Sequence, residues 1–155
     1  MADIRTLTET DLPRLRQFWL DHWGGDIMIV HGDTIRYDQV KGFIHGNWTG
    51  VLTYVIRGDE CEIVSFNSLR EEIGVGATLI AETVKEAKSQ GCRKIILTTT
   101  NDNLQALGFY QRRGFSLRAI RPGAINETRK LKPSIPLIGE NNIPLRDEIE
   151  LQMLI

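Results

Sequence analysis

Two hydrophobic periods run along the chain: a period of two, typical of strands, and a period of about 3.6, typical of helices. The shorter period predicts strands over 2–7 (ADIRTL), 41–47 (KGFIHGN), 49–58 (TGVLTYVIRG) and 61–69 (CEIVSFNSL). In the last of these, alternation places Glu62, Val64 and Phe66 on one face. Short turns join the strands after residue 40, so we expect an antiparallel meander.

The longer period predicts three helices. The first begins near Thr8, whose side chain can cap it, and ends at Gly24-Gly25. The second covers 74–90 and ends at Gly91, with one apolar face made by Ala77, Ile80, Val84 and Ala87. The third covers 104–114, after the capping residues NDN.

Strand patterns return over 92–100 (CRKIILTTT), 115–120 (FSLRAI) and 147–154 (DEIELQML). The segment 121–147 holds four of the five prolines, with a short helix expected over 124–132, and 26–40 remains without an assignment. The order of elements predicts an α/β class, or α+β mixed sheet, with helices on the sheet's faces.

Bulk composition narrows the classes of protein. At 155 residues, one domain over 1–155 is the default. A formal net charge of −1 argues against a nucleic-acid footprint, and no apolar run of about 18 residues predicts a membrane span. The first ten residues contain no apolar signal region, so we expect a cytoplasmic protein. Cys61 and Cys92 lie in apolar runs and are expected to be buried free thiols.

The stretch SLREEIGVGATLI (68–80) combines two opposed signals. Gly74-Val75-Gly76 opens a helix, where unpaired backbone amides and the helix dipole favour a phosphate. Glu71 and Glu72 stand directly before it, where a phosphate would meet negative charge. Alone, the two glycines fit equally well a simple strand–turn–helix corner.

A second motif changes this interpretation. The segment NLQALGFYQRRGF (103–115) resembles the N-x-x-A-x-x-F-Y-x-x-x-G-F segment of the GNAT N-acetyltransferases, which use acetyl-CoA. Its distance from EEIGVG and the order of elements also resemble that superfamily, over nearly the whole chain. The resemblance implies a GNAT-like fold: a mostly antiparallel sheet of about seven strands, splayed between strands 4 and 5 and flanked by helices.

The resemblance also implies an activity. A GNAT enzyme transfers the acetyl group of acetyl-CoA to an amine by direct attack in a ternary complex, without a metal, and nothing here has metal-ligand spacing. The acceptor would be a small-molecule amine or a protein amine. The alternative is a GNAT-fold module that binds CoA or a partner with little or no turnover, an interpretation that Glu71 and Glu72 keep open.

The family's cofactor contacts can be carried over residue by residue. They fall on the fourth strand, the glycine segment and the third helix: Ser65, Phe66, Arg70, Glu71, Glu72, Ile73, Gly74, Val75, Gly76, Ala77, Asn103 and Tyr110. This chain departs from the family at Glu71, which occupies a position that is Gln or Arg in the family pattern Q/R-x-x-G-x-G/A. Asn103 can also be no more than a helix cap.

The catalytic roles follow from the same resemblance. Tyr110 matches the tyrosine that lies by the thioester sulfur and can protonate the leaving thiolate, although a packing role is the simpler alternative. Glu62 is the candidate base that deprotonates the amine, directly or through water, with Glu60 as its alternative. His31 and His45 could also serve, but a lone histidine is more often a surface or packing residue.

The acceptor is not identified by any motif. In the family, the acceptor site involves the connection between the last two strands, which is long and rich in proline here and resembles that of an uncharacterised bacterial subgroup. A set of basic residues in it could favour an acceptor with a carboxylate or phosphate, or could belong to a solvated covering loop: Arg121, Arg129, Lys130, Lys132 and Arg146. Trp19, Trp23 and Trp48 could line a pocket, although core packing is the simpler expectation. Homodimers are common in relatives, so a dimer is expected by analogy alone.

We predict that Arg70→Ala weakens CoA binding and that Glu71→Arg strengthens it. Two exposed like charges about 4 Å apart repel by about 1 kcal/mol in water, whereas charge-assisted amide contacts contribute about 1.5–3 kcal/mol each. Binding therefore survives the glutamates at reduced affinity, with Arg70 supplying the compensating cation. Isothermal titration calorimetry measures both effects, and unchanged dissociation constants in both variants would show that Arg70 does not compensate.

Overall fold

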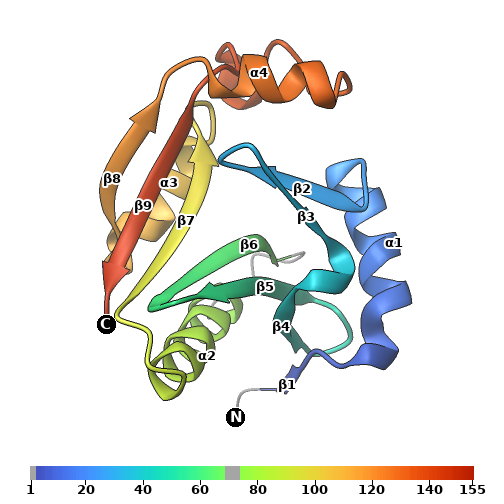
Figure 1. Ribbon diagram of the computed structural model, residues 1–155, viewed down its shortest axis with the longest axis vertical. Helices are drawn as coiled ribbons and strands as arrows, with labels where there is room; N and C mark the ends of the chain where they lie inside the picture. The colour runs from blue at the N-terminus through green and yellow to red at the C-terminus, as the bar shows by residue number, and fades with distance from the viewer. Residues whose placement is uncertain (1–2, 69–73) are drawn as a thin grey trace. The chain divides into compact units, whose positions relative to one another are not determined.

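The computed structural model describes residues 3–68 and 74–155, which form two compact units. The first unit contains Met1–Met28, Thr34–Ile95 and Leu154–Ile155, and the second contains Ile29–Asp33 and Ile96–Met153. Seven strands form one mostly antiparallel sheet in the order β1-β4-β5-β6-β7-β9-β8, and β2 pairs with β3 separately (Figure 1). The predicted class, a mixed sheet with flanking helices, is confirmed. The splay between strands 4 and 5 and the single domain over 1–155 stay predictions.

The N-terminal elements follow the predicted pattern. Strand β1 (Ile4–Thr6) leads through a 3-10 turn, η1 (Glu9–Asp11), into helix α1 (Leu12–Trp23). The Asp11 carboxylate accepts the Thr8 amide at 2.8 Å and pairs with Arg5 at 2.8 Å, which joins the strand to the turn. Gly24 ends the helix with a φ of 74°, a left-handed conformation that glycine adopts without steric cost.

The segment without a sequence assignment is a β-hairpin. Strands β2 (Ile27–Val30) and β3 (Asp33–Arg36) pair, and a 3-10 turn, η2 (Tyr37–Gln39), follows. His31 and Gly32 form the turn with φ values of 54° and 78°. Two consecutive positive φ values suit the tight two-residue turns that join antiparallel strands.

The predicted meander is confirmed as β4 (Lys41–His45), β5 (Gly50–Arg57) and β6 (Glu60–Ser68), each antiparallel to the next. The pairing of β5 with β6 shifts by one residue, because Thr53 opposes Ser65 while Tyr54 opposes Ile63. Val64 is therefore the extra residue of a β-bulge. The strict alternation predicted for this strand ends there, and Ser65 rather than Phe66 shares a face with Glu62.

Helix α2 (Val75–Ser89) packs against β4, β5 and β6 (Figure 1). Its buried face is made by Val75, Gly76, Leu79, Ile80, Thr83 and Ala87. Ile80 and Ala87 belong to the predicted face, whereas Ala77 and Val84 lie at its margin. A Cβ at Gly50 would lie 2.8 Å from Val75 Cγ1 and 2.9 Å from Leu79 Cδ1. Glycine at the start of β5 thus allows the first turns of α2 to approach the sheet closely.

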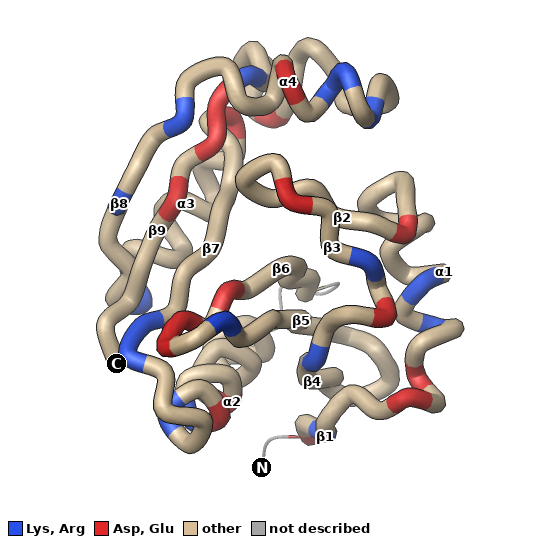
Figure 2. Tube along the Cα trace, in the orientation of Figure 1, with Lys and Arg blue, Asp and Glu red and all other residues tan. Residues whose placement is uncertain are grey.

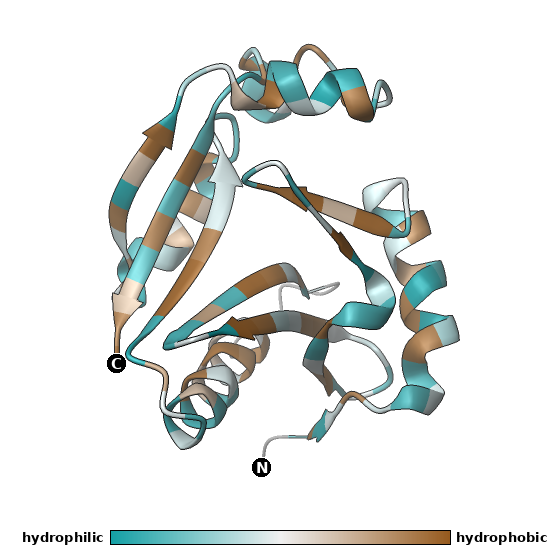
Figure 3. Ribbon diagram, viewed as in Figure 1, coloured by the Kyte–Doolittle hydropathy of each residue, from teal (hydrophilic) through white to brown (hydrophobic). Residues whose placement is uncertain are grey.

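The second unit contains most of β7 (Lys94–Thr100), which is hydrophobic in its first half and polar towards its C-terminal end (Figure 3). Helix α3 (Leu104–Arg112) follows, then strand β8 (Ser116–Arg121) and the predicted short helix, α4 (Ala124–Leu131). A 3-10 turn, η3 (Glu140–Asn142), precedes strand β9 (Glu148–Leu154), which is antiparallel to β8. None of the helices in the described ranges is both long and apolar enough to cross a membrane.

Candidate active site

The N-terminus of α2 has the geometry predicted for a phosphate cradle. Gly74 is the N-cap residue and has a φ of 97°, a conformation that suits glycine best, and the helix begins at Val75. In the first turn, the amides of Val75, Gly76 and Ala77 have no carbonyl one turn earlier in their own helix. Arg70, Glu71, Glu72 and Ile73, the other predicted members of this segment, lie outside the described residues.

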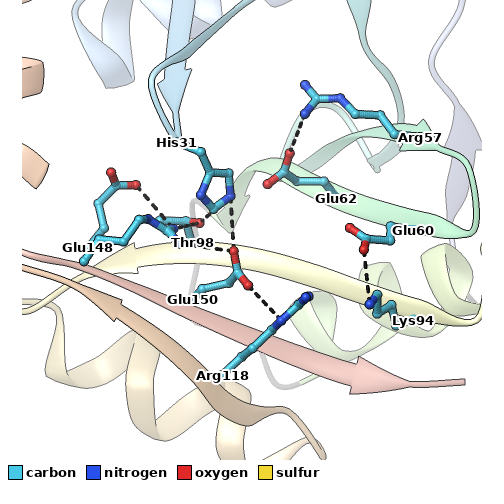
Figure 4. Close-up of polar contacts among 10 residues, drawn as sticks. His31, Arg57, Glu60, Glu62, Lys94, Thr98, Arg118, Glu148 and Glu150 are labelled. Carbon is cyan, nitrogen blue, oxygen red and sulfur yellow. Dashed lines mark hydrogen bonds and ion pairs between the residues drawn. The ribbon is translucent and has the colours of Figure 1, made fainter.

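Glu62 is a buried carboxylate on the sheet face away from α2. It is 3% exposed, and Arg57 Nη1 lies 3.6 Å from its Oε1 (Figure 4). Gly50 faces α2, and side chains alternate along a strand, so Tyr54 on β5 also faces α2. Ile63 opposes Tyr54 and shares its face, and Glu62, the next residue along β6, therefore faces the other way. Glu60 forms an ion pair with Lys94 at 3.1 Å and its side chain is 33% exposed. Of the two carboxylates proposed from sequence, Glu62 is the desolvated one.

Ser65 lies beside the bulge of β6, on the Glu62 face. Its hydroxyl and that of Thr53 are 2.5 Å apart, and both residues are buried. Bulges frequently occur beside active sites, where they redirect a backbone or side-chain group. The bulge at Val64 was missed by sequence reasoning, because an extra residue in one strand becomes visible only when its partner strand is known.

The second unit places Asn103 and Tyr110 on one helix, two turns apart. Asn103 is the N-cap of α3, and its Oδ1 accepts the Ala106 amide at 3.1 Å, so the capping role is confirmed. The ring of Tyr110 meets those of Phe109 and Phe115 edge-on, with centroids 5.4 and 5.5 Å away. These contacts fix the orientation of the Tyr110 ring.

The environment of Tyr110 keeps its hydroxyl protonated. Burial raises the pKa of Tyr110 above the ordinary value of a phenol, because desolvation penalises the phenolate. At neutral pH the side chain is therefore a hydrogen-bond donor. Cys61 is also kept neutral, since burial, with smaller effects from Cys92 and Glu62, raises its pKa to about 12, and both cysteines are buried free thiols as predicted.

A network of charges in the second unit was not predicted as such. Glu150 on β9 lies 3.2 Å from Arg118 Nε, 3.3 Å from Arg121 Nη1 and 3.4 Å from His31 Nε2 (Figure 4). Arg121 also lies 3.8 Å from Glu148, and both it and His31 contact the Thr98 hydroxyl. The sequence did hold a signal for this network. Glu148 and Glu150 alternate with apolar residues in a strand, so both carboxylates lie on one face, and a buried carboxylate requires a charged or hydrogen-bonding partner.

The basic residues of 121–147 are largely engaged within the second unit. Arg129 donates to the carbonyls of Ile135, Pro136 and Leu145, Lys130 pairs with Glu127, and Arg146 pairs with Asp147. Burial lowers the pKa of Lys132. Basic positions on β8 lie beside acidic positions on β9 (Figure 2). This pattern favours the covering-loop interpretation over a ready-made anion site.

The remaining candidates have structural partners. His45 Nδ1 contacts the Thr49 hydroxyl at 3.0 Å. Trp19 and Trp48 are buried in the core, as expected, whereas Trp23 is 42% exposed and donates to Asn67. Within residues 3–68 and 74–155, no group of three or more His, Cys, Asp or Glu side chains is placed to hold a metal ion.

Comparison with known proteins agrees with this geometry. Residues 4–115, which include the helix N-terminus, the bulged strand and the Asn103–Phe115 motif, match the acetyltransferase (GNAT) family. The chain belongs to this family of acetyltransferases.

Its relatives include two uncharacterised proteins of Bacillus subtilis (strain 168). YdhI is 41% identical over 139 residues, covering 87% of each chain, and YxbD is 37% identical over 138 residues, covering 86% of this chain and 87% of YxbD. A B. subtilis acetyltransferase solved with CoA has a similar fold, with a TM-score of 0.72 at 21% identity, covering 100% of this chain and 99% of that one. At that identity the similarity concerns the fold alone.

We predict that Glu150→Gln lowers the free energy of unfolding by about 1–3 kcal/mol, because the substitution keeps the shape and removes the charge that Arg118, Arg121 and His31 share. Urea denaturation measures the loss. Glu127→Gln, at a carboxylate that is 73% exposed, is the matched control and should change stability by less than about 0.5 kcal/mol. Equal effects of the two substitutions would show that the network does not stabilise the unit.

Proposed function

We propose that this acetyltransferase uses acetyl-CoA and transfers the acetyl group to the nitrogen of a primary amine, by direct attack in a ternary complex. The observation that carries the proposal is the glycine-capped first turn of α2, held against the sheet in a chain of the GNAT family. Related folds bind CoA, as the B. subtilis acetyltransferase does. The amine is carried by a small molecule or a protein, and the cytoplasmic location and the dimer stay predictions.

In the proposed binding mode, the diphosphate of acetyl-CoA accepts hydrogen bonds from the amides of the α2 first turn. Its negative charge is also favoured by the positive end of the helix dipole. Arg70, Glu71, Glu72 and Ile73 complete this segment in the proposal. Ser65 and Phe66 on β6 line the pantetheine arm, and Asn103 contacts that arm from the start of α3.

The reaction needs a neutral amine. A free alkyl amine has a pKa of about 10.4, so it must lose a proton before its nitrogen can attack the thioester carbonyl. Glu62 is the proposed base, directly or through water, because it is a desolvated carboxylate that faces away from α2. Backbone amides around the bulge, near Ser65 and Phe66, would stabilise the tetrahedral oxyanion.

Collapse of the tetrahedral intermediate breaks the carbon–sulfur bond and leaves the CoA thiolate. Tyr110 is the proposed donor to that sulfur. An ordinary thiol has a pKa of about 8.5, below that of a phenol, and burial raises the pKa of Tyr110 further. The hydroxyl would therefore act mainly by donating a hydrogen bond to the developing thiolate. The proton that the thiol finally carries would come from the former amine nitrogen, which becomes positively charged in the tetrahedral intermediate.

Two measurements test the function. Acetyl-CoA should raise the thermal midpoint and release heat on titration, and a panel of amines, polyamines, aminoglycosides, amino acids and peptides should include one that releases free thiol. Binding without thiol release on the whole panel would favour the alternative, a CoA-binding module without turnover, which the acidic pair Glu71 and Glu72 suggests. Absence of both signals at millimolar acetyl-CoA would overturn the proposal.

We predict that Tyr110→Phe lowers kcat by about 10²-fold and leaves the dissociation constant of acetyl-CoA nearly unchanged, since the proposed hydrogen bond forms as the sulfur departs and not in the bound ground state. Steady-state kinetics and calorimetry separate the two effects. Tyr54→Phe is the control, because it also removes a phenol hydroxyl whose pKa is raised, here to about 12 and mainly by burial, but Tyr54 has no proposed role. An unchanged kcat in Tyr110→Phe would remove Tyr110 as the donor.

A further inference from the structure

Two consecutive residues just after β7, Asn101 and Asp102, form hydrogen bonds with a segment about 40 residues further along the chain. Asn101 accepts the amides of Arg146 and Asp147 at 3.1 and 3.0 Å and donates to the Pro144 carbonyl at 2.8 Å. Asp102 and Asn103 continue the turn into α3. The segment after α4 thus returns beside the end of β7 and the start of α3 (Figure 1).

Asp102 is the centre of these contacts. Its side chain is buried, with the residue 4% exposed, and its Oδ2 accepts the Glu140 amide at 2.8 Å. Its Oδ1 accepts the Thr100 hydroxyl, and its own backbone carbonyl accepts the Asn141 side-chain amide at 2.9 Å. We name the contacts of Asp102 with residues 139–141 the clamp.

Gly139 shows how tightly the clamp is packed. Its φ is −96°, which any residue can adopt, so the backbone conformation does not require glycine. The lack of space at this position does require glycine, because a Cβ would clash with Asp102 Oδ2 and lie 2.7 Å from Asp102 Cγ. Real Cβ atoms do not approach other atoms so closely, and the buried carboxylate has little room to move.

The backbone on the loop side of the clamp is strained. Asn141 and Asn142 have φ values of 56° and 59°, and each left-handed non-glycine residue costs roughly 1 kcal/mol or more. Such strain persists where surrounding contacts determine the conformation. Here the Asn141 side chain bonds both Asp102 O and Gln105 Oε1, which is on α3.

The clamp acts next to a residue with a proposed role in cofactor binding. Asp102 precedes Asn103, whose backbone amide donates to Thr100 O at 3.2 Å and whose side chain caps α3. The Leu104 amide donates to Asp102 O at 3.1 Å, so the first turn of α3 also rests on the clamped residue. A shift of Asp102 would therefore move Asn103 and the first turn of α3.

We propose that Asp102 is a positioning residue that clamps the segment between α4 and β9 onto the β7–α3 turn, and thereby holds Asn103 in place for the pantetheine arm of acetyl-CoA. This role rests on the proposed function for its effect on acetyl-CoA, but the clamp itself rests on the contacts within the second unit. It gives the long proline-rich connection a role in cofactor binding, besides covering the fold.

A thermal double-mutant cycle tests the clamp independently of activity. Gly139→Ala should lower Tm by at least about 4 °C, because its Cβ meets the Asp102 carboxylate. Asp102→Ala should also lower Tm. The same substitution removes the carboxylate with which the Cβ added by Gly139→Ala would clash. The double variant should therefore be no less stable than Asp102→Ala alone, and additive losses would overturn the clamp.

Kinetics test the positioning role. Asp102→Ala should raise the KM for acetyl-CoA about tenfold while kcat falls less than twofold, since misplaced binding groups lose affinity. Asp102→Asn should restore the wild-type KM, because its amide can accept from the Glu140 amide and donate to the Thr100 hydroxyl. Glu127→Gln, in the exposed pair with Lys130, should leave KM unchanged.

The outcomes separate the two proposals. If the wild-type protein does not bind acetyl-CoA, the proposed function is wrong. The thermal double-mutant cycle then tests by itself whether the clamp contacts exist. Wild-type binding together with a normal KM in Asp102→Ala shows that the contacts only stabilise the fold, and this overturns the positioning role. A raised KM that Asp102→Asn does not restore would also contradict it, because the clamp contacts would then not explain the loss.

Discussion

The backbone amides at the first turn of α2 have no partners within their own helix, and the proposed chemistry depends on where the sheet holds them. Gly50 permits the close approach of Val75 and Leu79 that seats this turn on β5. Because the amides belong to a helix packed on three strands, their positions are fixed before a ligand arrives. A preorganised group of donors binds a diphosphate without first losing conformational entropy.

The same unit keeps its polar groups on the opposite face of the sheet. Glu62, Thr53 and Ser65 are all buried there, whereas Leu52, Tyr54 and Ile63 make the apolar side under α2. Burial of these three groups carries a desolvation cost, which the Thr53–Ser65 hydrogen bond and the Arg57–Glu62 ion pair offset in part. Val51 and Ile44, which are also buried, lie on the same face as Thr53, so this side of the sheet mixes polar groups with apolar core residues.

In the second unit, internal contacts hold the long connection between the paired strands β8 and β9. Its cations are used internally: Arg129 bonds three carbonyls of the loop, and Arg121 bridges Glu148 and Glu150. Asn101 and Asp102 attach the returning segment to the β7–α3 turn. The connection is therefore held in place by contacts within the second unit.

Sequence periodicity by itself determined most elements: the meander, the three main helices, the short α4 and the strand order along the chain. It also determined Gly74 and Asn103 as helix starts, since capping and glycine chemistry are local. Tertiary structure decided what depends on a partner: the bulge at Val64, the burial of Glu62 rather than Glu60, the β2–β3 hairpin and the contacts of Asp102 with residues 139–141. Local patterns record the backbone preferences of neighbouring residues, whereas register, desolvation and contacts between distant segments arise only when the chain brings those segments together.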